Sequence, residues 1–205
     1  LRNTILMYYL LANLKINICI LGHAETKRAD LARANYRDEV DYIVGSSSRN
    51  DFIINLCNEL KGNTLILYSL VEKHGKELYR LAQDLDKNVF FVHGGVSGVD
   101  RDEIRGIVEK ENDALIVASY GTFSTGVNIR RLSNIVFASP SKSKIRVLQS
   151  IGRGLRTADD KDTTRLFDIV DDLRWRKWTN FTLKHYGDRL KIYNDEQFQY
   201  RIYKY

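Results

Sequence analysis

The chain has 205 residues, of which 43% are apolar and 28% are charged, and its formal net charge is +6. This composition is ordinary for a globular protein of one large domain, or of one domain with an appendage. It excludes a bilayer-spanning segment, because no apolar run is long enough, and residues 4–21 lack the basic start and small-residue cleavage site of a signal peptide. Cys19 and Cys57 lie in apolar surroundings without a nearby ligand partner, which predicts reduced core residues of an intracellular protein.

The predicted elements alternate between strands and helices along the chain. Short apolar runs predict strands at 16–21, 63–68, 88–92, 114–118, 134–138 and 164–170. Capped or amphipathic segments predict helices at 47–60, 71–85, 100–111 and 143–155. Short, nearly continuous apolar strands separated by helices indicate an α/β fold, with a parallel sheet covered on both faces and right-handed crossovers.

The last part of the chain is rich in aromatic and basic residues. Residues 171–205 contain nine of the 22 aromatic residues and eight of the 32 Lys and Arg residues. Such a mixture suits stacking on bases and neutralising phosphates, and the positive net charge favours a polyanionic partner. The alternative is an amphipathic tail that packs its rings on the domain. We expect residues past 172 to form helices outside the sheet.

Polar clusters follow the predicted strands at the points where each strand ends. Ser69 follows one strand, His93 and Gly94 follow another, and the hydroxyl-rich stretch 119–126 follows a third. In parallel sheets, ligands bind at the carboxyl ends of the strands and in the loops that follow them. The sequence therefore predicts a binding site at this edge of the sheet.

The stretch "VLQSIGRGLR" at 147–156 predicts a helix with a polar stripe beside its apolar face. Gln149, Arg153 and Arg156 share that stripe, and Gly152 and Gly154 lie between them. Glycine costs a helix interior about 1 kcal/mol relative to alanine, so this pattern needs a reason other than helix stability. The plain alternative is a pair of surface arginines on an amphipathic helix.

Three segments, in this order, resemble the second RecA-like domain of superfamily 2 helicases. Residues 64–69 resemble motif IV, residues 116–129 ("IVASYGTFSTGVNI") resemble motif V, and 149–156 fit the motif VI pattern Q-x-x-G-R-x-x-R. "VASYGTFSTG", "LFDIVDDL" and the tail "LKHYGDRLKIYNDEQFQY" extend the likeness to the recombination helicases of tailed phages.

The resemblance covers roughly residues 14–205. It implies a RecA-like domain at 14–172, a helical C-terminal extension at 173–205 and an unplaced segment at 1–13.

The resemblance implies a role for each motif residue. Arg156 would be the arginine finger on the γ-phosphate, Arg153 a second phosphate-facing arginine, and Gln149 a residue that holds the nucleotide cleft together. Gly126, Asn128 and Gly152 would couple the nucleotide cleft to the nucleic acid. The nucleic-acid contacts would come from Ser69, His93, Gly94, Ser119, Thr122, Ser124 and Thr125. Two departures are that the stretch 118–126 is one residue longer than usual and that Asn128 stands where Asp is frequent. A glycine-rich turn is the alternative for motif V.

Equally informative is what the sequence lacks. No G-x-x-x-x-G-K-[ST] phosphate loop is present, and the "DEVD" at 38–41 follows "RANYR" rather than an apolar strand, so we interpret it as a chance match. We therefore expect half of an ATPase, with ATP and Mg²⁺ held chiefly by a P-loop domain of the same enzyme and no metal ligand in this chain.

Its expected partner is single-stranded or branched DNA, and its expected location is the host-cell cytoplasm if a phage encodes it. The rival hypothesis is a catalytically inert nucleic-acid-binding module on a RecA-like scaffold.

Overall fold

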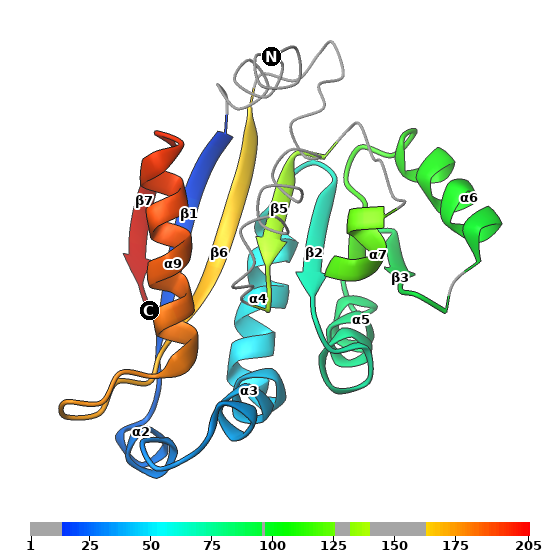
Figure 1. The fold of residues 1–205 in the computed structure, drawn as a ribbon. Helices are drawn as coiled ribbons and strands as arrows, with labels where there is room; N and C mark the ends of the chain where they lie inside the picture. The colour runs from blue at the N-terminus through cyan, green and yellow to red at the C-terminus, as the bar shows by residue number, and fades with distance from the viewer. Residues whose placement is uncertain (1–13, 96, 126–131, 140–162) are drawn as a thin grey trace.

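Seven parallel strands form one sheet in the order β3-β4-β2-β5-β6-β1-β7 (Figure 1). The computed structural model describes residues 14–95, 97–125, 132–139 and 163–205. The strands are β1 (Leu14–Gly22), β2 (Thr64–Tyr68), β3 (Val89–Val92), β4 (Leu115–Ser119), β5 (Asn134–Phe137), β6 (Thr164–Asp172) and β7 (Gln199–Lys204). The predicted α/β class and its parallel sheet are confirmed.

The strands β2, β4 and β5 lie in the centre of the sheet because their sequences are nearly continuous apolar runs. Every residue of β2 ("TLILY"), β4 ("LIVAS") and β5 ("NIVF") is buried, as expected for strands covered on both faces. β2 lies between the other two, so that Thr64 pairs with Leu115 on one side and with Asn134 on the other. The carboxyl ends of these strands therefore meet at one edge of the sheet.

Helices cover both faces of the sheet and enclose two apolar cores. One face packs against α4 (Ser47–Glu59) and α5 (Lys76–Ala82), whose buried residues include Ile53, Cys57 and Leu78. The other face packs against α6 (Gly98–Val108), α7 (Tyr120–Thr125) and α9 (Phe181–Asp195). The remaining helices, α2 (Glu25–Leu31) and α3 (Tyr36–Gly45), lie below the carboxyl edge in Figure 1.

Both cysteines are buried and unpaired, as the sequence predicted. Cys19 lies on β1 and Cys57 on α4, in the core between these elements. Burial raises the pKa of each thiol to about 12. Neither thiol is therefore reactive at neutral pH.

The chain after residue 172 is only partly helical, so one expectation is wrong. Residues 199–204 form β7, which pairs in parallel with β1 and extends the sheet. The reason is that β7 is an edge strand, exposed at five of its six residues, and its "QYRIYK" sequence carries too few apolar residues to indicate a strand. The extension therefore completes the sheet as well as covering it.

α9 is fixed to the sheet by a buried ion pair. Arg189 donates from Nε and Nη2 to the two carboxylate oxygens of Asp168 on β6, at 2.9 and 2.8 Å, and both side chains are fully buried. The Tyr193 hydroxyl donates to the same carboxylate at 2.9 Å. Tyr186, Tyr193 and Phe198 are buried as well. For these three rings, packing on the domain is confirmed.

Candidate functional site

Predicted contact residues gather at the carboxyl edge of three neighbouring strands. Ser69 follows β2, His93 and Gly94 follow β3, and Ser119 ends β4, which lies between those two strands. The fold thus brings these residues, which are far apart in the sequence, to one edge of the sheet, as expected for loops at the carboxyl ends of parallel strands.

The start of motif V is built as a helix cap. The Ser119 hydroxyl donates to Thr122 Oγ1 at 2.8 Å and accepts from the Thr122 backbone N–H at 3.2 Å. Ser119 is thus the N-cap of α7. Both residues are buried, so these hydroxyls fix the direction in which the motif V segment leaves β4.

The backbones of Ser124 and Thr125 lie in α7, but their side chains are outside the described structure. Six further predicted residues lie outside the described residues altogether: Gly126, Asn128, Gln149, Gly152, Arg153 and Arg156. Their roles stay predictions. In the sequence these residues fall between β4 and β5 or between β5 and β6.

An aromatic stack positions His93. The ring of Phe91 stacks on Tyr79 with centroids 4.9 Å apart, and it contacts the ring of His93 at the same distance. The backbone N–H of Gly95 donates to His93 Nδ1 at 3.1 Å. A neutral His93 therefore carries its proton on Nε2, with a fixed ring plane beside the exposed Gly94.

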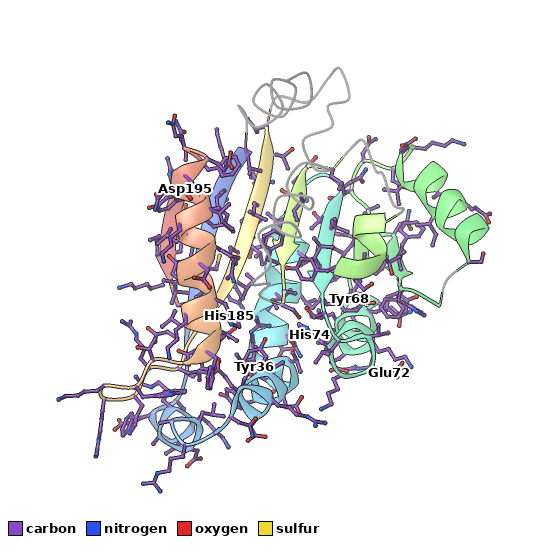
Figure 2. The ribbon with its side chains drawn as sticks, viewed as in Figure 1. Tyr36, Tyr68, Glu72, His74, His185 and Asp195 are labelled. Atoms are coloured by element: carbon purple, nitrogen blue, oxygen red, sulfur yellow. The ribbon has the colours of Figure 1, made fainter. Side chains whose placement is uncertain are left out.

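Motif IV is followed by an unusual turn. Residues Val71–Gly75 form a π-helix that continues directly into α5. A Cβ at Gly75 would lie 2.4 Å from the Tyr68 ring, so only glycine lets the turn pass so close to the end of β2. Figure 2 shows Tyr68 and His74 together at this point. Such π-turns are frequent at functional sites.

Ser69 borders an apolar pocket between α3 and the end of β2. The pocket has a volume of about 190 Å³, and Ile43, Val44 and Leu70 form much of its wall. The polar groups that line it are hydroxyls, Ser69 and Ser139 among them. The described lining therefore offers hydrogen bonds but no charged group to a bound phosphate.

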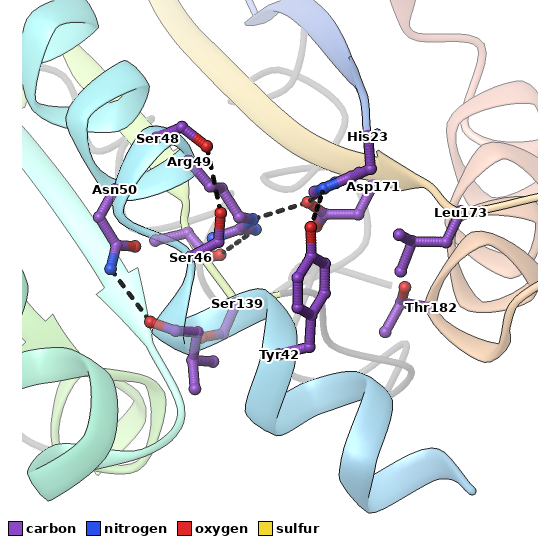
Figure 3. A network of polar contacts seen from close by, with 12 residues as sticks. His23, Tyr42, Ser46, Ser48, Arg49, Asn50, Ser139, Asp171, Leu173 and Thr182 are labelled. Carbon is purple, nitrogen blue, oxygen red and sulfur yellow. Dashed lines mark hydrogen bonds and ion pairs between the residues drawn. The ribbon is translucent and has the colours of Figure 1, made fainter. Parts of the chain in front are cut away.

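Beside this pocket lies a buried polar cluster that we call the carboxyl-edge network. Its members come from both ends of the sequence: His23, Tyr42, Arg49, Asn50, His74, Ser139 and Asp171. Figure 3 shows its members other than His74, between α3, α4 and the ends of β1 and β6. Sequence reasoning missed it.

Asp171 is the anion of this network. Arg49 Nε donates to Asp171 Oδ1 at 2.8 Å, and His23 Nε2 donates to the same oxygen at 3.1 Å. Arg49 Nη2 also donates to the carbonyl oxygen of Ala138 at 2.7 Å, which ties α4 to the end of β5. Burial alone would raise the pKa of the Asp171 carboxyl, but the Arg49 charge and these hydrogen bonds outweigh burial and lower the pKa below its ordinary value.

His74 is held neutral in the same network. Asn50 Oδ1 can only accept, so His74 Nε2 donates to it at 3.2 Å, and His74 Nδ1 accepts from the Ser139 hydroxyl at 2.9 Å. Burial, with the nearby charge of Arg49, lowers the pKa of His74 to about 3. The π-turn after motif IV is thus bonded to Ser139, two residues past the end of β5.

The "DEVD" stretch at 38–41 serves the fold. It lies within α3, and the Glu39 carboxylate accepts from the backbone N–H groups of Phe181 and Thr182 at 2.8 and 2.7 Å. These are the first N–H groups of α9, so Glu39 caps that helix from a distant part of the chain. Its interpretation as a chance match agrees with this contact.

No metal centre is evident within the described part of the chain. No group of three or more His, Cys, Asp or Glu side chains in it could hold a metal ion. The described side chains therefore do not fit a Mg²⁺ site. The described helices also include none that is long and apolar enough to cross a membrane.

This arrangement, with a parallel sheet and motif-bearing loops at its carboxyl edge, is that of a helicase C-terminal domain. The model of the helicase conserved C-terminal domain matches residues 48–158, more than half of the chain, and the chain belongs to this family. The predicted RecA-like fold is confirmed.

Among relatives, the chain is 34% identical over 200 residues to the ATP-dependent DNA helicase UvsW of Enterobacteria phage T4. That match covers 91% of this chain and 40% of the relative. The crystal structure of T4 UvsW matches with a TM-score of 0.80, covering 94% of this chain and 41% of that one. The chain thus spans about two fifths of the length of this relative. The predicted likeness to the recombination helicases of tailed phages is confirmed.

Two further matches widen the family. The putative ATP-dependent helicase IRC3 of Saccharomyces cerevisiae is 27% identical over 107 residues, covering 51% of this chain and 15% of that protein. A DEAD box protein of Methanococcus jannaschii has a TM-score of 0.60 at 15% identity, covering 94% of this chain and 42% of that one. The second match shows a shared fold alone.

Proposed function

We propose that this chain is the C-terminal motor domain of an ATP-dependent DNA helicase or translocase of the UvsW type. The observation that supports this most is the meeting of Ser69, His93 and the start of motif V at one sheet edge, in a member of the helicase C-terminal family. The whole enzyme would unwind, migrate or anneal branched DNA during recombination, replication and repair, in the cytoplasm of the host cell.

Each motif has a distinct task in this proposal. Arg156 meets the charge that builds on the γ-phosphate, Arg153 assists it, and Gln149 holds the cleft by hydrogen bonds. Gly126, Asn128 and Gly152 couple this cleft to the nucleic-acid contacts. Those contacts use Ser69, His93, Gly94, Ser119, Thr122, Ser124 and Thr125.

The nucleotide itself is held chiefly by another domain. This sequence has no phosphate loop, so a P-loop domain of the same enzyme supplies the phosphate-binding amides and lysine and the carboxylate for Mg²⁺. Hydrolysis of ATP bound between the two domains would supply the free energy. The arginines of this chain bind and orient its terminal phosphate. The 205-residue chain alone is therefore expected to show no ATP turnover.

The test is Arg156→Ala in the enzyme that contains the P-loop domain. Loss of a finger removes charge stabilisation in the transition state, so kcat for DNA-stimulated ATP hydrolysis should fall by about 10³–10⁵. DNA affinity should stay near normal, because the finger acts mainly on the transition state. Arg156→Lys should rescue little, since an ammonium cannot reproduce the planar guanidinium.

Arg80→Ala is the matched control. Arg80 lies on α5 with an exposed side chain whose ion pair with Glu77 is local, so its loss should leave kcat unchanged. Normal turnover by a folded Arg156→Ala enzyme would overturn the assignment. DNA binding without ATP turnover in the wild-type enzyme would favour the inert nucleic-acid-binding module.

A further inference from the structure

A two-residue turn projects from the sheet where β6 ends. Trp175 and Trp178 pair across it, with backbone N–H to O distances of 3.1 and 2.8 Å, and Arg176 and Lys177 form its tip. We call residues 173–180 the tryptophan hairpin. In Figure 1 it reaches beyond α9 on the side where α2 lies.

An open groove of about 460 Å³ lies between the tryptophan hairpin and α2. Trp175 and Trp178 line it together with three cations, Arg33, Arg176 and Lys177. The α2 side contributes the small side chains of Ala29 and Ala32, which leave room above the rings. The groove thus combines aromatic surface with positive charge.

The three cations of the groove are available to a ligand. All three are exposed, and no ion pair among the described residues engages them. The neighbouring Arg174 differs, because Asp172 accepts two bonds from its Nε at 2.9 and 3.1 Å and neutralises it. The groove therefore has an uncompensated positive charge.

Arg176 occupies a backbone conformation that normally favours glycine. Its φ is 51°, in the left-handed region, where a Cβ is disfavoured. Its guanidinium lies 5.7 Å from the Trp175 ring centroid, on the groove. Strained residues cluster at ligand-binding sites, and this one presents a cation beside an aromatic ring.

We propose that the tryptophan hairpin is a nucleic-acid contact of this chain, separate from motifs IV, V and VI. A nucleotide carries a flat ring and an anion a short distance apart, which matches Trp175 or Trp178 beside Arg176, Lys177 and Arg33. The base stacks on an indole and the phosphates pair with the cations. The proposal rests on the proposed function, because it adds a second contact for the same DNA, along the same carboxyl edge of the sheet.

Intrinsic fluorescence tests the proposal directly, because the chain contains only two tryptophans and both lie in the hairpin. The 205-residue chain is titrated with a single-stranded oligothymidine while indole emission and the anisotropy of a labelled oligonucleotide are followed. We expect saturable quenching at low salt that weakens as salt rises. An abasic oligonucleotide of equal length should bind with little quenching. Trp175→Phe and Trp178→Phe, which keep a ring at each position, assign the quenching to one indole.

Charge reversal tests the cations. Arg176→Glu combined with Lys177→Glu should weaken binding roughly tenfold and lower the slope of log K against log salt by about 1.4, or about 0.7 per lost phosphate contact. The control is Lys15→Glu combined with Arg201→Glu. It makes the same charge change at two exposed cations of another groove, which lies across β1, β6 and β7 and contains no tryptophan. The control should lose less than threefold.

Three results would overturn the proposal. Saturable anisotropy without a change in indole emission would place the DNA elsewhere and leave the proposed function standing. An equal loss of affinity in both double variants would mean that general charge attraction is sufficient. Quenching by polyglutamate as strong as by oligothymidine would identify an acidic peptide as the partner. The outcome of the Arg156 experiment does not affect any of these readouts.

Discussion

Two buried carboxylates of β6, Asp168 and Asp171, face opposite layers of the molecule and are paired differently. Asp168 faces α9, and both of its oxygens accept bonds from Arg189 or Tyr193. Asp171 faces α4, and its Oδ1 accepts from both Arg49 and His23. Asp171 Oδ2 is buried without a hydrogen-bond partner among the described residues, and so is one terminal nitrogen of each cation, Nη1 of Arg49 and Nη1 of Arg189.

The two carboxylates therefore have different structural roles. Both oxygens of Asp168 accept hydrogen bonds, and this pair joins one helix, α9, to the sheet. The carboxyl-edge network joins α3, α4, the π-helix and β6 to the residues that follow β1 and β5, and it retains an unpaired carboxylate oxygen, Oδ2 of Asp171. Each buried group without a partner costs about 1–3 kcal/mol. We therefore expect the Asp168 pair to contribute more to stability and the network to respond more to its surroundings.

Removing the cation of the Asp168 pair should have the largest effect on stability. Arg189→Ala leaves Asp168 buried without its cation, which should lower the free energy of unfolding by about 3–5 kcal/mol. Urea denaturation measures this change. Lys191→Ala, at an exposed position of the same helix, should change stability by no more than about 0.5 kcal/mol. Similar values for the two variants would refute the role given to the pair.

Acid should weaken the carboxyl-edge network through His74. His74 has a folded-state pKa of about 3 against an ordinary value of 6.5, so the unfolded chain takes up a proton that the folded chain refuses. The contribution of His74 is therefore present above pH 6.5 and is lost as the pH falls toward 3. The free energy of unfolding should decrease below pH 6.5 by up to about 1.4 kcal/mol per pH unit.

The variant His74→Gln isolates this effect. It should cost about 1–3 kcal/mol at pH 7, because Ser139 and Asn50 lose a well-placed partner. It should also flatten the decrease between about pH 6.5 and 5.5, a window above the ordinary pKa values of Asp and Glu. Urea denaturation across that window compares the two proteins, and parallel curves would show that His74 is not the titrating group.

The smallest effect is expected where β6 leaves the sheet for the tryptophan hairpin. Arg176→Gly relieves a left-handed backbone and should raise the free energy of unfolding by up to about 1 kcal/mol. DNA affinity should fall in the same variant, because a cation of the groove is lost. Lys177→Gly removes a neighbouring cation without relieving a positive φ, so it should weaken binding without the gain in stability. Calorimetric melting measures the stability of both variants. A gain in stability for Lys177→Gly would contradict the strain assigned to Arg176.

How far the sequence predicts the fold depends on burial. β2, β4 and β5 were predictable because each is a short, nearly continuous apolar run. β7 was not, because an exposed edge strand has no apolar face to reveal it. The turn of the tryptophan hairpin was also missed, since Arg-Lys is not a sequence that favours such turns.

The candidate site was likewise predictable only in part. Motif residues were found because each follows a strand at a recognisable spacing. The carboxyl-edge network could not be predicted, because Arg49 and Asp171 are 122 positions apart and His23 and Asp171 are 148 apart. Only the sheet order β5-β6-β1 brings these side chains together.

The edge position of β7 has a consequence for solubility. Its outer side carries main-chain N–H and C=O groups that no other described strand pairs with, and Ile202 and Tyr203 beside them are 47% and 39% exposed. An edge of this kind is a template for strand addition by a second molecule. Arg201 and Lys204 lie on the same strand and are exposed, so a second copy that paired there would bring cations against cations. Charge on the last strand thus disfavours the addition of a second copy at this edge.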